Sequence, residues 1–196
     1  MPSIVLASGS AYRSELLKKL QLDFTTCGSH IDETPLANET AYDLALRLAV
    51  AKARSVSKQW TESLIIGSDQ TADCGGQFLH KPGNRETAIQ QLCIQSGRSV
   101  IFYTGLILLD SASGKQISTV ETCTVHFRKL SLEQITYYVD KERPFDCAGA
   151  FKSEGLGIAL FKKIESDDPN TLIGLPLIKL IELLNEFGVD VLKLRT

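Results

Sequence analysis

Short apolar segments alternate with amphipathic helical segments along the chain, and this alternation restricts the possible fold more than any other feature. The apolar segment 3–8 leads directly into 10–20, where Ser10 can cap a helix and leucines recur at helical spacing. A long amphipathic helix over 38–60 is followed by an apolar run over 63–74 that is typical of a buried strand. Strands that alternate with helices in this way predict an α/β fold.

The remaining segments add strands of both directions to this pattern. The double glycine at 75–76 predicts a hairpin, and the turn 111–114 joins two long apolar strands into an antiparallel pair. The charged segment 162–170 is expected to be a solvated loop. Further helices are predicted over 84–95, over 131–142 and before Gly188. We therefore expect a mixed, twisted sheet flanked by helices, in one domain of two lobes that spans residues 1–196.

The overall composition excludes several classes of protein. With 21 basic and 23 acidic side chains, the chain lacks the basic surplus of proteins that bind nucleic acids. Its start lacks the pattern of a signal peptide, and no uncharged apolar stretch approaches the about 20 residues that span a bilayer. The five cysteines form no C-x-x-C pair, which favours reduced thiols. We expect a cytoplasmic protein with no nucleic-acid or membrane partner.

The junction between the first strand and the first helix has the features of an anion site. Ser8, Gly9 and Ser10 precede a helix whose free N–H groups and dipole attract negative charge. Arg13 lies in the first turn, where a basic side chain opposes the dipole unless it has an anionic partner. A capped helix with a solvated arginine explains the same residues, so the motif alone leaves both interpretations open.

A single lysine interrupts the apolar stripe of the helix predicted over 38–60. Lys52 continues the i, i+4 series of Leu44 and Leu48. Burying its ammonium without a partner would cost several kcal/mol. The side chain therefore either extends to solvent along an apolar surface or points its charge at a phosphate or carboxylate in a cleft.

Acidic residues near these cations are suited to a divalent metal. Asp69 follows the apolar run LIIG, where a carboxylate must meet water, a cation or a metal ion. Glu33 lies beside Asp32 in a polar loop, and Lys81 is held extended by the following proline. Two acids beside phosphate-binding cations provide the hard oxygen ligands that Mg²⁺ or Mn²⁺ requires.

Eight segments in a fixed order resemble the Maf family of nucleoside triphosphate pyrophosphatases. These segments are LASGSAYRSELL, DETP, RLAVAKA, IIGSDQ, KP, FYTGL, CAGAFKSEGLG and NTLIGLPL. The resemblance covers roughly residues 3 to 185. It implies a homodimeric, two-lobed α/β protein of the ITPase-like type with a cleft between its lobes. Such a protein hydrolyses a nucleoside triphosphate between the α and β phosphates with Mg²⁺ or Mn²⁺.

The resemblance also implies roles for individual residues. Asp69 corresponds to the catalytic proton acceptor and, with Glu33, to a ligand of the metal ion. The positions that bind phosphate correspond to Ser8, Arg13, Lys52 and Lys81. These are the residues that the charge and apolar patterns single out independently.

Three positions favour the YceF-like branch of the family, whose substrate is 7-methyl-GTP. Where this chain has Tyr12, Gln70 and Glu154, the branch that acts on dTTP and UTP typically has arginine, threonine and glutamine. A glutamate only accepts hydrogen bonds, which suits the N–H groups on the edge of guanine. Methylation at N7 makes the ring cationic, which favours a carboxylate and an aromatic face such as that of Tyr12. The branch often has tryptophan at position 12, so the tyrosine is a departure that keeps an aromatic ring.

Three alternatives remain at this stage. One is a pyrophosphatase of the same family that prefers dTTP, UTP or another noncanonical nucleotide. Another is a regulatory binding protein in cell-division arrest, a role proposed for the family, in which catalysis would be vestigial. A thiol-redox protein is the third, and the spacing of the cysteines disfavours it.

Overall fold

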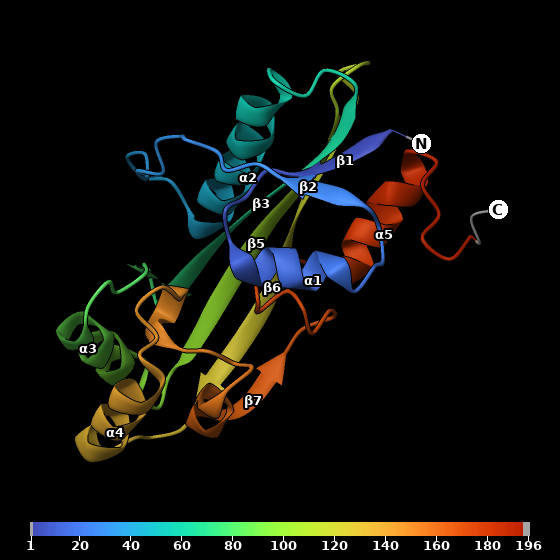
Figure 1. Ribbon diagram of the computed structural model, residues 1–196. Helices are drawn as coiled ribbons and strands as arrows, with labels where there is room; N and C mark the ends of the chain where they lie inside the picture. Colours follow the sequence, from blue (N-terminus) through green and yellow to red (C-terminus); the bar gives the residue numbers. More distant parts are fainter. Residues whose placement is uncertain (1, 194–196) are drawn as a thin grey trace. The chain divides into compact units, whose positions relative to one another are not determined.

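The computed structural model describes residues 2–193 and divides the chain into two compact units (Figure 1). The first unit contains the residues up to Asp69, Thr104–Glu121 and the residues from Asp168 onward. The second unit contains Gln70–Tyr103 and Thr122–Asp167. That the two units make up a single domain stays a prediction.

Five α-helices, seven strands and two short 3-10 helices make up the regular structure of the described part. The helices are α1 (Ala11–Lys18), α2 (Ala41–Ser57), α3 (Arg85–Gln95), α4 (Leu132–Glu142) and α5 (Leu177–Glu186). The strands are β1 (Ser3–Leu6), β2 (Phe24–Thr26), β3 (Ser63–Cys74), β4 (Gln77–Leu79), β5 (Ser99–Asp110), β6 (Gln116–Phe127) and β7 (Phe161–Glu165). The 3-10 helices are Ala148–Ala150 and Leu156–Leu160. Within residues 2–193, no helix has the length and apolar composition needed to cross a membrane.

The strands form a mixed sheet in the order β2-β1-β3-β5-β6-β7, with β4 also paired to β3. Strand β1 runs parallel to β2 and β3, so that Ile4 lies opposite both Phe24 and Leu64. Strands β4 and β7 are antiparallel to their partners β3 and β6. The predicted mixed α/β sheet flanked by helices is therefore confirmed.

One expectation about local structure was wrong. The segment 162–170 is predicted to be a charged loop, but its start belongs to β7, where Ile164 pairs with Val125 and Glu165 with Thr124 of β6. β7 ends the strand order of the sheet, and four of its five residues are exposed. Charged side chains are common on edge strands because they block pairing with other chains. The composition of such a strand therefore resembles that of a loop.

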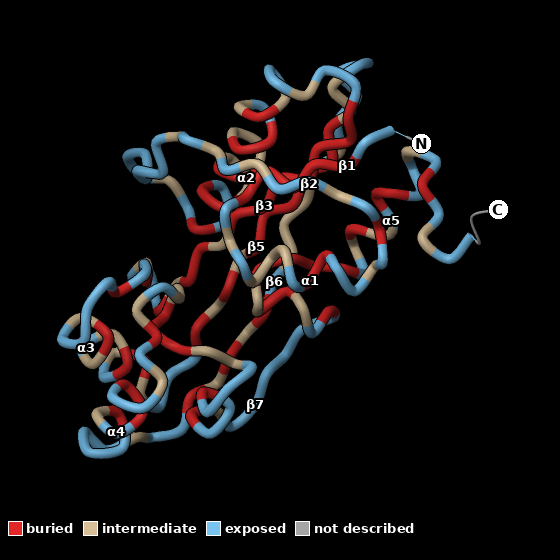
Figure 2. Tube along the Cα trace, in the orientation of Figure 1, coloured by how far each residue is buried: buried red, intermediate tan, exposed pale blue. Residues whose placement is uncertain are grey.

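The alternation of side chains along the strands divides the core of the first unit into two layers. Figure 1 locates the strands and helices concerned, and Figure 2 marks most of β1 and β3 as buried. The even-numbered apolar side chains of the strands pack with α1 and α5. They are Ile4, Leu6, Leu64, Ile66, Leu106 and Leu108. The odd-numbered apolar side chains of the strands pack with α2. They are Val5, Ile65, Ile107 and Leu109. By the same alternation, Asp69 faces α2 and Ser68 faces the opposite layer.

Two glycines let the backbone of α2 approach the sheet closely. A Cβ atom on Gly67 would lie 2.4 Å from the carbonyl oxygen of Ala49, and one on Gly105 would lie 2.2 Å from that of Ala45. Both distances are far below van der Waals contact with a backbone atom that cannot rotate away. Only glycine is compatible with this distance between helix and sheet.

The second unit has its own core. Helix α3 packs against α4, and four phenylalanine rings pack edge to face with centroids 4.9 to 5.7 Å apart. The rings belong to Phe102, Phe127, Phe151 and Phe161. The phenol oxygen of Tyr138 accepts a hydrogen bond from the N–H of Lys152 (2.9 Å), and burial raises the pKa of this tyrosine. This bond anchors the loop that carries Glu154.

The glycine contacts give a prediction about stability. We expect Gly67→Ala to destabilise the protein by about 2 kcal/mol or more, because the methyl group must push α2 away from the sheet. In a chain of this size, that loss lowers Tm by roughly 4–8 °C in thermal unfolding. Gly28→Ala is the matched control, since a Cβ atom there has no neighbour within 4 Å in the described structure. Equal Tm values for the two variants would contradict the close approach.

Candidate active site

One lysine holds two carboxylates in the first unit. The Nζ atom of Lys52 lies 2.5 Å from Oδ1 of Asp69 and 2.7 Å from Oε1 of Glu33. The side chains of Lys52 and Asp69 are only 9% and 11% exposed, whereas that of Glu33 is 57% exposed. Of the two interpretations of Lys52, the structure favours the one in which its ammonium points at carboxylates.

Each member of this cluster comes from a different element. Lys52 lies on the face of α2 that covers the sheet, and Asp69 lies on β3 two residues beyond Gly67. Residues two apart in a strand share a face, so the close approach of α2 over Gly67 also brings the helix to Asp69. Glu33 comes from the irregular segment between β2 and α2. Sequence-distant residues are thus joined in a single charged cluster.

The start of α1 provides a second positive group. The hydroxyl of Ser10 caps the helix by accepting a hydrogen bond from the N–H of Arg13, and the buried Ser8 accepts one from the N–H of Ser10 (3.1 Å). Burial lowers the pKa of the Arg13 guanidinium, while the negative charges of Asp69 and Glu33 act in the opposite direction. A guanidinium stays protonated despite such a shift. Arg13 therefore adds a positive charge close to the two acids.

The residue that holds Arg13, which is Gly174, was missed by the sequence analysis. The carbonyl oxygen of Gly174 accepts hydrogen bonds from Nε of Arg13 (2.7 Å) and from the buried hydroxyl of Ser68 (3.0 Å). Gly174 has φ +114°, which favours glycine. The carboxylate of Asp168 fixes the same loop by accepting bonds from the N–H groups of Asn170 (2.7 Å) and Ile178 (2.6 Å). The motif NTLIGLPL was the available signal, but an acceptor on the backbone leaves no mark on the sequence.

The other predicted site residues lie as follows. Tyr12 is half-buried on α1 in the first unit, whereas Gln70, Lys81 and Glu154 belong to the second. Gln70 follows Asp69 in β3, Lys81 is exposed after β4, and Glu154 is exposed and accepts a hydrogen bond from the hydroxyl of Ser153 (2.8 Å). Their membership of one site with Asp69 stays a prediction.

Glu33 and Asp69 are suited to bind a divalent cation whose other ligands are water and phosphate oxygens. In the part of the chain that the structure describes, His, Cys, Asp and Glu side chains form no group of three that could enclose a metal ion. Glu33 and Asp69 instead converge as a pair, with one oxygen of each against the same ammonium. Mg²⁺ commonly binds one or two carboxylates and completes its shell with water and substrate phosphates. The chemistry of this donor set therefore suits Mg²⁺ or Mn²⁺.

Comparison with known proteins agrees with the sequence motifs. The model of the family described as Maf-like protein matches residues 3–187. The chain belongs to the Maf family. A relative from Colwellia psychrerythraea, named 7-methyl-GTP pyrophosphatase, is 52% identical over 98% of this chain and 96% of its own length. A relative of the same name from Vibrio vulnificus is 53% identical over 96% and 97%. The resemblance to the Maf family is therefore confirmed.

Solved structures show the same fold as this Maf family chain at much lower sequence identity. The Ham1 protein of Staphylococcus aureus superimposes with a TM-score of 0.54 and 15% identity, over 95% of this chain and all of that one. A HAM1 protein from Coxiella burnetii gives a TM-score of 0.56 and 17% identity over the same shares. At this identity the likeness concerns the fold alone, and it agrees with the predicted α/β class.

The buried ion pair gives a prediction about stability within the Maf fold. We expect Lys52→Met to destabilise the protein by about 3 kcal/mol, because the substitution leaves the buried carboxylate of Asp69 without its partner. The double variant Lys52→Met with Asp69→Asn should be more stable than Lys52→Met alone, since it removes the uncompensated charge. Urea unfolding measures both differences.

Lys18→Met is the matched control for this experiment. Lys18 forms an exposed ion pair with Glu15, and such pairs contribute about 0–1 kcal/mol. A loss of stability in Lys52→Met no larger than that in Lys18→Met would contradict a buried, energetically coupled pair.

Proposed function

We propose that this chain hydrolyses 7-methyl-GTP to 7-methyl-GMP and pyrophosphate, and thereby removes a modified nucleotide. The observation that carries this proposal is the cluster in which the buried Lys52 and Asp69 meet the exposed Glu33, found in a Maf family chain. Relatives that share about half of its residues over nearly the whole length are named 7-methyl-GTP pyrophosphatases. The cluster contains the acid, the cation and the metal-compatible oxygens that cleavage of a phosphoanhydride needs.

Asp69 is the proposed general base. Its Oδ1 is fixed by Lys52, so the carboxylate has a defined direction within a buried setting. It accepts a proton from the water that attacks the α-phosphorus, and the bond from that phosphorus to the bridging oxygen of pyrophosphate breaks. The proton lies on Asp69 after the step, and the electron pair leaves with pyrophosphate.

Glu33 and Asp69 are the proposed ligands of Mg²⁺ or Mn²⁺. When bound, the metal ion polarises the phosphoryl group and offsets negative charge on its oxygens. Lys52 and Arg13 supply positive charge from the protein, and the start of α1 adds its N–H groups around Ser8. Lys81 is proposed as a further cation on the pyrophosphate side.

Base recognition is proposed for Tyr12, Gln70 and Glu154. Glu154 is exposed in the second unit, and Nζ of the nearby Lys152 donates a hydrogen bond to the carbonyl oxygen of Glu142 (3.2 Å). A carboxylate at position 154 suits the N1–H and N2–H₂ donors of guanine, and its charge complements the cationic 7-methylguanine ring. We further propose that the protein acts as a homodimer in the cytoplasm, on free nucleotides.

The proposed role of Asp69 predicts a large loss of turnover in Asp69→Asn. Without a proton acceptor, we expect kcat for pyrophosphate release from 7-methyl-GTP to fall about 100- to 1000-fold or more. The measurement is pyrophosphate release by purified protein with Mg²⁺ or Mn²⁺, and circular dichroism verifies folding. Asp73→Asn, on the same strand, is the control and should retain activity. Near-normal turnover by a folded Asp69→Asn protein would refute the assignment.

The proposed base reading predicts a change of selectivity in Glu154→Gln. An amide presents both a donor and an acceptor, so it loses one match to guanine and gains one to uracil. We expect the ratio of kcat/KM for 7-methyl-GTP to that for UTP to fall about tenfold, within the range of one lost bidentate contact. Glu133→Gln on α4 is the control. An unchanged ratio across a panel of nucleotides would remove Glu154 from base recognition.

A further inference from the structure

The segment that carries Glu33 has no regular secondary structure of its own. Residues 27–40 form neither helix nor strand, and Glu33 itself is exposed. Its carboxylate nevertheless lies against the buried ammonium of Lys52. A glutamate on an unrestrained loop would lose substantial rotamer and backbone entropy in adopting this position. Other contacts must therefore hold the loop in place.

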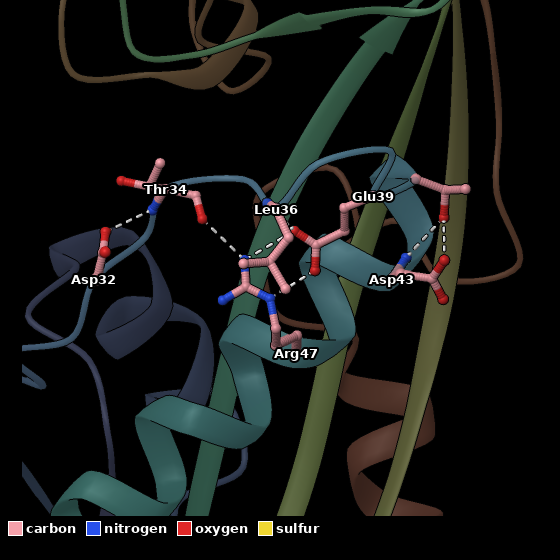
Figure 3. A network of polar contacts seen from close by, with 7 residues as sticks. Asp32, Thr34, Leu36, Glu39, Asp43 and Arg47 are labelled. Carbon is pink, nitrogen blue, oxygen red and sulfur yellow. Dashed lines mark hydrogen bonds and ion pairs between the residues drawn. The ribbon is translucent and has the colours of Figure 1, made fainter.

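Arg47 of α2 holds this loop through a fork of hydrogen bonds (Figure 3). Its Nε and Nη2 atoms donate to the two carboxylate oxygens of Glu39 at 2.6 and 2.8 Å, and Nη2 also donates to the carbonyl of Thr34 (3.1 Å). Glu39 in turn accepts a bond from the N–H of Leu36 (2.9 Å). The carboxylate of Asp32 accepts one from the N–H of Thr34 (2.9 Å). We call these five residues the Arg47 clamp.

The clamp acts on the residue next to Glu33. Both the N–H and the carbonyl of Thr34 are engaged, the first by Asp32 and the second by Arg47. The side chain of Glu39 is only 7% exposed, so its paired bonds to Arg47 are partly shielded from water. A bidentate arginine–carboxylate pair fixes both the distance between the two side chains and their relative orientation. The backbone that leaves Glu33 is thus held in one orientation.

The charges of the clamp reinforce one another. The hydrogen bond from Arg47 lowers the pKa of Glu39, and the bond to Glu39 raises the pKa of Arg47. Hydrogen bonds from Thr34 lower the pKa of Asp32. These three groups are therefore fully ionised at neutral pH, where the network is intact.

Arg47 and Lys52 are placed to work together because both lie on α2. They are five positions apart on the helix, a rise of about 7.5 Å along the axis. The loop is tied to the helix at Arg47 through its backbone, and Glu33 meets the same helix again at Lys52. We propose that Arg47 is a positioning residue, which holds the loop on α2 so that Glu33 completes the acidic pair with Asp69 and raises the affinity for a divalent cation. This inference rests on the proposed function, because it concerns the proposed metal ligands.

The inference predicts weaker metal binding in Arg47→Gln. We expect the Kd for Mn²⁺, measured by electron paramagnetic resonance without nucleotide, to rise about tenfold or more, as is typical when the support of a ligand is removed. The Mg²⁺ concentration for half-maximal pyrophosphate release should rise similarly, while kcat at saturating Mg²⁺ changes little. Amide hydrogen exchange at Thr34 and Leu36 should accelerate, which is a readout independent of activity.

Two arginines provide matched controls. Arg54→Gln removes an exposed arginine two turns further along α2, and Arg85→Gln breaks an exposed bidentate pair with Asp140 in the second unit. Neither should change the Kd for Mn²⁺. If Arg47→Gln does not fold, Glu39→Gln breaks the same fork from the loop side and should raise the Kd in the same way.

A double-variant cycle separates positioning from a general structural effect. If Arg47 acts through Glu33, Arg47→Gln should add almost nothing to the loss of Mn²⁺ affinity caused by Glu33→Gln. The proposal would be overturned if the double variant lost Mn²⁺ affinity by the product of the two single-variant factors. An unchanged Kd in Arg47→Gln would overturn it as well. Mn²⁺ binding that weakens in Arg47→Gln although the wild type releases no pyrophosphate would support the clamp and reject only the proposed function.

Discussion

The distance between α2 and the sheet is the constraint on which the charged cluster depends. Gly67 and Gly105 remove the side chains that would separate the helix from the strands, so the backbone of α2 lies directly over them. At this distance Lys52 reaches Asp69 at 2.5 Å while both side chains stay buried. The ion pair in turn makes the burial of each charge tolerable, since either one alone would be costly.

The alternation of β3 then distributes the contacts over both faces of the sheet. Asp69 points toward α2, whereas the preceding Ser68 donates to the carbonyl of Gly174 in the loop before α5. The same carbonyl fixes Arg13 of α1. Strand β3 therefore connects Asp69, which is bound by α2 on one face of the sheet, to Arg13 of α1 on the other face.

The sequence predicted the site residues that interrupt an apolar pattern. It did not predict those whose residue type is ordinary for their position. Lys52 could be predicted because its charge interrupts the apolar stripe of a helix, and Asp69 because its charge follows an apolar run in a strand. Arg47 looks like an ordinary solvated arginine, and its role depends on where an irregular loop returns to the helix. Gly174 acts through a carbonyl that every residue possesses, and β7 has the composition of a loop because it is an edge strand.

The charges of the first unit explain why this cluster can exist before substrate arrives. Lys52 and Arg13 balance Asp69 and Glu33, so the four groups together carry no net formal charge. In the proposed function, Glu33 and Asp69 would hold the divalent cation, and the phosphates of the substrate would give Lys52 and Arg13 anionic partners. Glu33 is exposed on a loop that the Arg47 clamp holds on α2, whereas Asp69 is buried in a strand. This difference in exposure suits the proposed roles of Glu33 as a metal ligand and of Asp69 as the general base.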